Sequence, residues 1–388
     1  MNSLLLILSK LRYFAPAWVF ASLNIMAGTW VLYIPHVKKA LAIDDGQLGI
    51  ALFCLSLGAL VMIPMASTIT KAIGLGKTTI LAIVIYALVF LLPLVAPSYL
   101  LLCIALFVTG LMLSLTDIAM NALVSEIEKE DQVHFMSASH GFFSLGGVLG
   151  AGIGSLVISK FEVPVVHMAF AAIGVIVTNV LIAKAYISVK GGERETEDEK
   201  KSFSLKLLKP LLGLTIIAFL IMGSEGAIEH WSKLYLQDIV KVASEEIAGI
   251  GFVAFSATMT LGRFFGDAVS KRFGSLAIVI GGCLIGLLGF LSILNTQLVS
   301  AIVGFALVGL GFSVIIPELF RLAGKAKGVS SAEGISFVAG FGYVGFLASP
   351  AILGFLADYG TLRLSFTALF IATIVAMLIS LFLKRRAA

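Results

Sequence analysis

The sequence predicts an all-α membrane protein of twelve transmembrane helices, arranged as two pseudo-symmetric six-helix halves. Three observations support this fold class. Apolar residues make up 59% of the 388 residues and charged residues only 13%, whereas a soluble domain has about 25% charged residues. The mean hydropathy of +1.07 is too high for one globular core, so lipid must be part of the solvent. The chain also contains twelve long apolar runs, and one stretch occurs twice.

The repeated stretch runs from Gln47 to Gly74 and again from Ile247 to Gly274. With an offset of 200 positions, Ser56 aligns with Ser256, and the glycine that closes each copy aligns with the other. Each copy is an apolar run that ends in a short basic turn, Lys-Ala-Ile-Gly or Lys-Arg-Phe-Gly. Two copies so far apart in one chain indicate two similar halves.

Each half contains six apolar runs that are long enough to cross a bilayer, which takes about twenty residues. The charged segment 188–209 separates the sixth run from the seventh and is expected to be a cytoplasmic linker between the halves 1–187 and 210–388. Met1 to Ser9 lacks the order of a cleaved signal peptide and is expected to form a short helix or a frayed lead-in. The expected spans are 13–34, 47–70, 78–96, 98–124, 138–159, 166–187, 210–236, 247–270, 276–294, 298–320, 332–356 and 363–383.

The distribution of lysine and arginine predicts the orientation of these spans. If the N-terminus is cytoplasmic, twenty of the 27 Lys and Arg residues fall in cytoplasmic segments and six fall on the other face. Cytoplasmic loops carry the excess of positive charge in membrane proteins. We therefore expect both termini on the cytoplasmic side of a cell membrane, which we take to be a bacterial inner membrane.

The basic turn in each copy of the repeat resembles the loop signature Gly-x-x-x-Asp-Arg-x-Gly-Arg-Lys of the major facilitator superfamily, found after the second and eighth spans. Twelve spans in two halves with a charged linker are also similar to that superfamily. Lys71 and Lys271 stand where the signature has Asp, so the family's charge relay in this loop is not carried over. The resemblance implies a secondary transporter whose halves rock about a substrate site near the bilayer midplane.

Three stretches resemble the fucose-permease-like branch of the superfamily, nearest the bacterial subgroup that contains the rhizopine-associated membrane protein. They are Asp117 to Asn121 in the fourth span, Ser139 to Gly146 at the start of the fifth, and Ser224 to Trp231 in the seventh, with Tyr343 in support. The branch implies sugar-like or polyol-like substrates and proton coupling.

Ionisable residues inside a span are costly and usually face a cavity or a partner. Asp117 and Asn121 lie one helical turn apart, on one face of the fourth span. We interpret Asp117 as a proton-exchanging group that lines the cavity, with Asn121 bound to substrate or to Asp117. The alternative is that Asp117 is a structural acid tied to a neighbouring helix.

The seventh span carries a second pair of this kind, Glu225 and Glu229. An offset of 201 aligns Glu225 with Asn24 and Trp231 with Trp30, so each half offers a polar group at mid-depth and a tryptophan beyond it. A ring that stacks on a sugar while polar groups bind its hydroxyls suits a pocket. The alternative for the two tryptophans is an aromatic belt at the membrane surface.

Other polar residues have simpler interpretations. His140 suits proton exchange because histidine titrates near neutral pH, but it could equally fix the hairpin between the fourth and fifth spans. Arg263 and Asp267 are expected to form an ion pair within the eighth span, and Glu318 is expected to pair with Arg321 next to a bend at Pro317. His36, His134 and His167 lie near helix ends and are expected at the surface.

The sequence therefore predicts a transporter, not an enzyme, of a small sugar-, polyol- or amino-sugar-like solute, and it is expected to be monomeric. An exporter of amphipathic compounds on the same fold and a non-transporting sensor remain alternatives. No cofactor or nucleic-acid partner is expected. No disulfide or metal site is expected either, because Cys54, Cys103 and Cys283 all lie in apolar runs. The site candidates are Asp117, Glu225 and His140 for proton coupling; Asn24, Trp30, Asn121, Ser144, Glu229, Trp231 and Tyr343 for substrate binding; and Lys71, Arg263, Asp267, Lys271 and Arg272 for a cytoplasmic latch.

Overall fold

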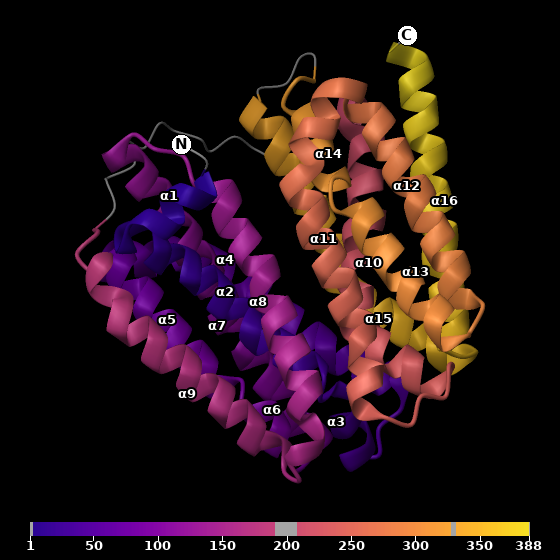
Figure 1. Ribbon diagram of the computed structural model, residues 1–388, viewed down its shortest axis with the longest axis horizontal. Helices are drawn as coiled ribbons and strands as arrows, with labels where there is room; N and C mark the ends of the chain where they lie inside the picture. The colour runs from indigo at the N-terminus through magenta and orange to yellow at the C-terminus, as the bar shows by residue number, and fades with distance from the viewer. Residues whose placement is uncertain (1–2, 191–207, 327–330, 388) are drawn as a thin grey trace. The chain divides into compact units, whose positions relative to one another are not determined.

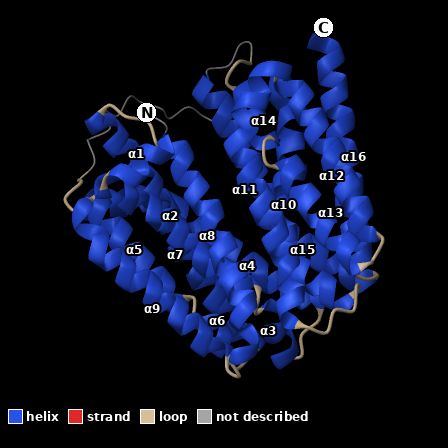
Figure 2. Cartoon of the chain, in the orientation of Figure 1, coloured by secondary structure: helices blue, strands red, loops and turns tan. Residues whose placement is uncertain are grey.

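The computed structural model describes residues 3–190, 208–326 and 331–387, and every regular element in these ranges is helical. Figure 2 shows long helices joined by short loops, without a strand in the part of the chain that is described. Figure 1 colours the chain in order, and its two compact units are Met1–Glu193 and Arg194–Ala388. The division falls inside the predicted linker, most of which lies outside the described residues.

Unit 1 contains the helices of the first predicted half, and the first of them, α1, is the short helix expected before the first span. The 29-residue α4 begins at Asp45 and ends at Ile73, so it covers the first copy of the repeat. Its N-terminus is fixed by a capping box, in which the Asp44 carboxylate accepts from Gln47 N at 2.7 Å. The helices are α1 (Ser3–Ser9), α2 (Leu11–Val31), α3 (Ile34–Ala40), α4 (Asp45–Ile73), α5 (Leu75–Val89), α6 (Leu92–Val95), α7 (Tyr99–Asp131), α8 (Met136–Val157) and α9 (Pro164–Ile182).

Unit 2 repeats this order with longer terminal helices. The second copy of the repeat lies in α11, which is also 29 residues long. The span predicted at 298–320 is interrupted: α13 ends at Phe312, and α14 carries Pro317 in its first turn, as the expected bend requires. The helices are α10 (Leu208–Asp238), α11 (Glu245–Phe273), α12 (Ser275–Leu294), α13 (Leu298–Phe312), α14 (Ile315–Ala323), α15 (Ser331–Tyr359) and α16 (Leu362–Ala387).

Eleven segments of the described chain are long and apolar enough to cross a membrane. They correspond to the predicted spans except the eighth, because α11 is not among them. Two of the eleven join short helices, α5 with α6 and α13 with α14. The eleven spans make the chain a multi-pass membrane protein, while the count of twelve and the side of each terminus stay predictions.

Close helix contacts in unit 1 depend on glycine. A Cβ added at Gly110 of α7 would overlap the Leu55 carbonyl oxygen of α4, and one added at Gly58 would overlap the Phe107 carbonyl oxygen. The α2–α8 contact uses the same device, since a Cβ at Gly146 would overlap the Ala21 carbonyl oxygen. Small residues at such contacts let helix backbones approach closely within a membrane.

The turns that close the two copies of the repeat share one backbone conformation. Gly74 has φ +94° and Gly274 has φ +79°, both in a region that side chains disfavour. Gly74 N donates to Thr70 O at 2.9 Å at the end of α4. The next helix begins at once in each half, at Leu75 and at Ser275.

Acidic side chains at the end of α7 connect it to the starts of α2 and α8, at the predicted cytoplasmic end of unit 1. Glu128 Oε1 accepts hydrogen bonds from Phe135 N and from Met136 N at 2.7 Å, which satisfies donors at the start of α8. Arg12 at the start of α2 forms ion pairs with Glu130 and Asp131. In this unit, carboxylates after the fourth span therefore tie α2, α7 and α8 together.

Candidate functional site

Asp117 and Asn121 lie half-buried on one face of α7, as their spacing predicts. Asn121 Nδ2 donates to Asp117 O at 2.8 Å and to Asp117 Oδ1 at 3.2 Å. The amide therefore steadies the acid locally, which is one of the two roles expected for Asn121. The oxygen of the Asn121 amide is left as an acceptor for another donor.

In unit 2 the predicted carboxylates Glu225 and Glu229 lie on one face of α10. Between Ile221 and Leu236 every residue of α10 is buried except Met222, Glu225 and Glu229, which are half-buried. These three recur at intervals of three and four, so they share one side of the helix. Along this stretch of α10, one side is partly exposed, and it carries both carboxylates.

Glu225 is paired across helices with Arg263 of α11. Arg263 Nη2 lies 3.8 Å from Glu225 Oε2, while Glu225 Oε1 is buried and has no hydrogen-bond partner. Sequence spacing predicted Asp267 as the partner of Arg263; the side chains of Asp267, Lys271 and Arg272 lie outside the described residues. The interhelix pair was missed because the spacing of residues within one helix carries no information about a neighbouring helix.

Trp30 and Trp231 are buried inside their own units, with 2% and 0% of their surface exposed. The Nε1 atom of each ring has no hydrogen-bond partner in the described structure. Trp30 packs against Phe90 with ring centroids 6.0 Å apart. This burial does not fit the alternative of an aromatic belt facing lipid headgroups, and a role in substrate binding stays a prediction.

Three further candidates of unit 1 lie around the contact between α2 and α8. Asn24 Nδ2 donates to Phe143 O at 2.9 Å, so this amide already links the two helices. Ser144 Oγ donates to His140 O at 3.5 Å. The His140 side chain is exposed, and its ring meets Phe20 edge-on with centroids 5.1 Å apart. Of these three residues, His140 is the one with an accessible titratable group.

The remaining candidates are more exposed or lie elsewhere. Tyr343 of α15 is 54% exposed. Lys71 is exposed and makes no ion pair with the described residues, so nothing described here ties it to a latch. The expected pair of Glu318 and Arg321 is present, with 2.9 Å between Oε1 and Nη1. The prediction that His167 lies at the surface is wrong.

His167 is buried because Tyr33, in the turn before α3, and Phe161, in the loop before α9, cover its ring. Its Nδ1 atom lies 2.8 Å from the Tyr33 hydroxyl, and its ring stacks on Phe161 with centroids 4.8 Å apart. The side chain is only 7% exposed. Sequence position near a helix start suggested exposure, but a tyrosine from a distant helix end covers the ring.

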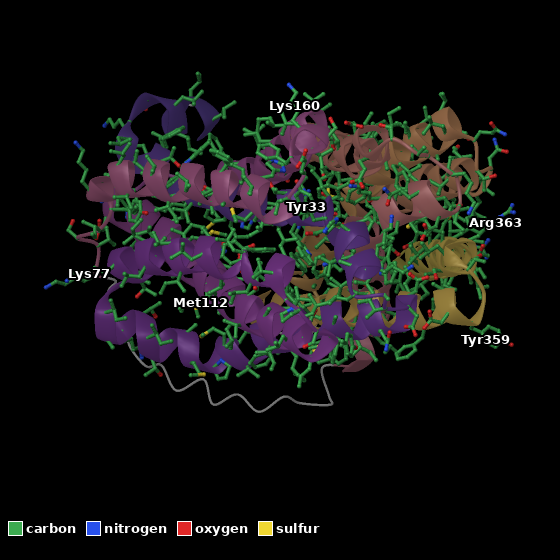
Figure 3. The ribbon with its side chains drawn as sticks, turned by 90° about the horizontal axis from the view of Figure 1, so that it is seen from below. Tyr33, Lys77, Met112, Lys160, Tyr359 and Arg363 are labelled. Carbon is green, nitrogen blue, oxygen red and sulfur yellow. The ribbon has the colours of Figure 1, made fainter. Side chains whose placement is uncertain are left out.

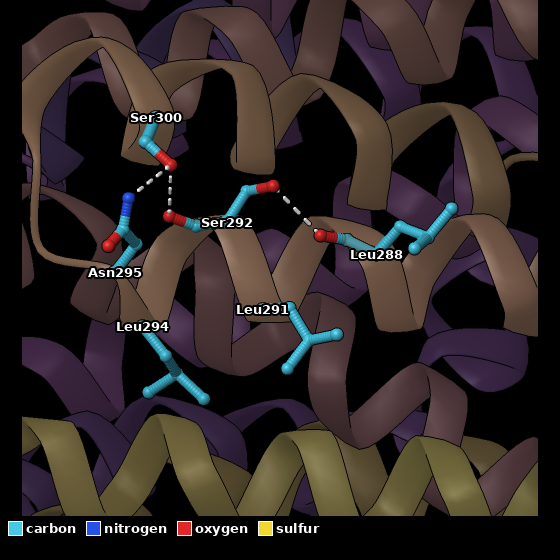
Figure 4. A pocket seen from close by; sticks show the side chains of 6 residues that line it. All are labelled: Leu288, Leu291, Ser292, Leu294, Asn295 and Ser300. Carbon is cyan, nitrogen blue, oxygen red and sulfur yellow. Dashed lines mark hydrogen bonds between the residues drawn. The ribbon is translucent and has the colours of Figure 1, made fainter.

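A surface hollow of about 510 Å³ lies on α12 and the start of α13. Figure 4 shows its lining, in which the hydroxyls and amide mostly bond to one another or to the backbone: Leu288, Leu291, Ser292, Leu294, Asn295 and Ser300. Leu288 and Leu291 are about half exposed, as expected for a helix side facing lipid. The hollow contains none of the predicted site residues.

Curated proteins similar to this chain are two bacterial transporters and a bacterial membrane protein. It is 30% identical over 363 residues to the uncharacterized transporter y4wD of Sinorhizobium fredii, covering 92% of this chain and 93% of that protein. An uncharacterized MFS-type transporter of Yersinia pestis is 28% identical and covers 93% of this chain and 92% of its own length. Membrane protein MosC of Rhizobium meliloti is 28% identical, covering 90% and 84%.

Solved structures share the fold at low sequence identity. A mutant of the nucleoside transporter NupG superposes with a TM-score of 0.80 at 12% identity, covering 96% of this chain and 99% of that one. The E. coli fucose:proton symporter FucP superposes with a TM-score of 0.63 at 17% identity, covering 96% and 99%. The resemblance to the fucose-permease-like branch seen in the sequence is supported by these comparisons. The profile of the Major Facilitator Superfamily matches residues 17–332, and the chain belongs to that superfamily.

Proposed function

We propose that this protein is a secondary active transporter that moves a small polar solute of the sugar, polyol or amino-sugar kind across the bacterial inner membrane. Transport proceeds by alternating access of the two halves and is coupled to protons. The proposal includes twelve spans, cytoplasmic termini and a monomeric protein. Two proteins that share the fold, the nucleoside transporter NupG and the fucose:proton symporter FucP, are consistent with a polar, hydroxylated solute.

The observation that carries the proposal is a carboxylate within a long apolar helix of each unit. Asp117 lies in α7 and Glu225 in α10, and both helices are long and apolar enough to span a membrane. A charged group at such a position is costly, so it is usually retained for ion or substrate handling. Asp117 has a local amide partner, whereas Glu225 has a cationic one.

The Glu225–Arg263 pair offers a way to couple proton binding to helix movement. Addition of a proton to Glu225 removes the charge that attracts Arg263, so the link between α10 and α11 weakens. A solute that favours one arrangement of these helices would then favour one protonation state of Glu225. By this linkage a proton gradient drives the solute.

The test uses purified protein in liposomes, with a solute chosen by screening sugars, polyols, amino sugars and drugs for thermal stabilisation. Ligand binding to the native state stabilises it by mass action. We expect solute addition to drive proton uptake, and we expect this flux to fall at least tenfold in both Asp117→Asn and Glu225→Gln. Glu162→Gln, which changes an exposed carboxylate near α9, is the matched control and should keep wild-type flux.

Unchanged proton movement in both variants would remove these carboxylates from coupling. Stabilisation by cationic amphiphiles alone would instead favour export of amphipathic compounds.

A further inference from the structure

Three cations of unit 2 have carboxylate partners among the described residues. Arg263 pairs with Glu225, and Lys233 Nζ lies 2.9 Å from Glu245 Oε2. Arg321 pairs with Glu318. Glu229 differs, because its carboxylate makes no hydrogen bond or ion pair with the residues that the structure describes. A charge in a low-dielectric interior needs a partner, so a complementary group from a ligand would be strongly favoured there.

A second, independent observation lies one turn further along α10. Ser232 follows Glu229 by three positions and Glu225 by seven, so it falls on the same side of a helix with 3.6 residues per turn. Ser232 is 0% exposed, and its Oγ atom has no hydrogen-bond partner among the described residues. Buried hydroxyls are nearly always hydrogen-bonded. We refer to Met222, Glu225, Glu229 and Ser232 as the α10 carboxylate face.

We propose that the α10 carboxylate face binds the ammonium group of a polyhydroxylated amine. The Glu229 carboxylate is the ion partner of the ammonium group, and the Ser232 hydroxyl bonds a hydroxyl of the solute. Glu225, held by Arg263, lies one turn away and is left for proton coupling. The inference rests on the proposed function, since it assumes a small hydroxylated solute and specifies its charge.

The residue types support an amine over a neutral sugar. A sugar hydroxyl can donate to a carboxylate, but a neutral sugar leaves the charge of an ionised carboxylate unpaired. Hydrogen bonds between a carboxylate and an ammonium group are charge-assisted and about twice as strong as neutral ones. Among the described groups of this face, only Ser232 can both donate and accept, so the face suits one ammonium group beside one hydroxyl.

The test compares matched trios of solutes on the purified full-length protein. Each trio contains a hydroxyl parent, its amine and the N-acetylated amine, built on a hexose, an alditol and a cyclitol. Thermal stabilisation is measured near neutral pH, where the amines are still largely protonated and the carboxylates remain ionisable. We expect the amine of at least one trio to bind at least tenfold more tightly than its parent, which corresponds to about 1.4 kcal/mol. The N-acetylated member, which has the same skeleton without the charge, should bind no better than the parent.

Variants assign the effect to this face. Glu229→Gln should abolish the preference for the amine, while Asp238→Asn, at the exposed end of the same helix, should keep it. Ser232→Ala should weaken binding of amine and parent alike and leave their ratio unchanged. Each variant is first compared with wild type for its melting midpoint without solute, and the N-acetylated solutes test the charge requirement on the unaltered protein.

The outcomes separate the inference from the proposed function. If the hydroxyl parent binds as tightly as its amine, or more tightly, in every trio in which binding is seen, the inference is overturned and the proposed function stays in place. Persistence of the amine preference in Glu229→Gln also overturns it. A lack of stabilisation by every member of every trio contradicts both, because the solute class itself would then be wrong.

Discussion

Lys233 shows at the scale of one residue how unit 2 accommodates a buried charge. Its side chain is 1% exposed, whereas that of its partner Glu245 is 49% exposed. The pair links the end of α10 to the first turn of α11. Unit 1 has a comparable but more open link, in which Lys38 Nζ lies 2.6 Å from Asp45 Oδ1 at the start of α4.

This asymmetry predicts unequal effects of two substitutions. Glu245→Gln should destabilise the protein by about 3 kcal/mol, because the buried Lys233 ammonium loses the carboxylate that offsets its burial. Lys233→Met should have a much smaller effect, since methionine fills a similar volume and Glu245 can turn to solvent. Thermal melting in detergent gives both values, with Asp45→Asn as the comparison, because its partner Lys38 is 21% exposed. Equal losses for Glu245→Gln and Lys233→Met would contradict this explanation.

Some residue pairs could be predicted from sequence and others could not, for one physical reason. Glu318 and Arg321 are neighbours on one helix, so their pairing follows from spacing alone. The partner of Arg263 depends on how α10 meets α11, and the burial of His167 depends on how the turn before α3 meets the start of α9. Such contacts are set by tertiary packing, and the spacing of residues within a single sequence does not show which helices meet.

At the scale of an element, the α4–α7 contact is the most demanding packing in unit 1. Gly110→Ala would place a methyl group against the Leu55 carbonyl oxygen, and the backbones would have to separate. We expect a loss of roughly 1–3 kcal/mol, typical of overpacking. Gly174→Ala in α9 is the matched control, because nothing lies within 4 Å of its Cβ position. The control should keep the melting midpoint, and an equal midpoint for both variants would refute the close contact.

The helices themselves were largely predictable, because hydropathy marks each span and the repeat marks the halves. Span interruptions were harder to place. Pro317 indicated the bend between α13 and α14. The break between α5 and α6 lies at Phe90, before Pro93, and was not predicted. The run predicted at 247–270 lies in α11, whose side chains from 264 to 272 lie outside the described residues.

At the scale of the whole molecule, the charge distribution predicts which loops face the cytoplasm. Figure 3 labels three exposed basic residues near helix ends, Lys77, Lys160 and Arg363. Cysteine at each position, with the three native cysteines replaced, can be probed on intact cells with a membrane-impermeant maleimide. We expect labelling at positions 160 and 363, and at position 77 only after permeabilisation. The reverse pattern would invert the proposed topology.

The connection leaving unit 1 has a mechanical consequence. Gly76 N donates to Val189 O at 2.9 Å, and Leu75 N donates to Lys190 O at 3.4 Å. The chain that follows α9 thus satisfies two donors in the first turn of α5. With these residues tied down, the tether to unit 2 loses about 7 Å of its maximal reach. The hydrogen bonds attach the chain after α9 to the start of α5, next to the turn that closes the repeat. This attachment point therefore moves together with α5 when unit 1 rotates.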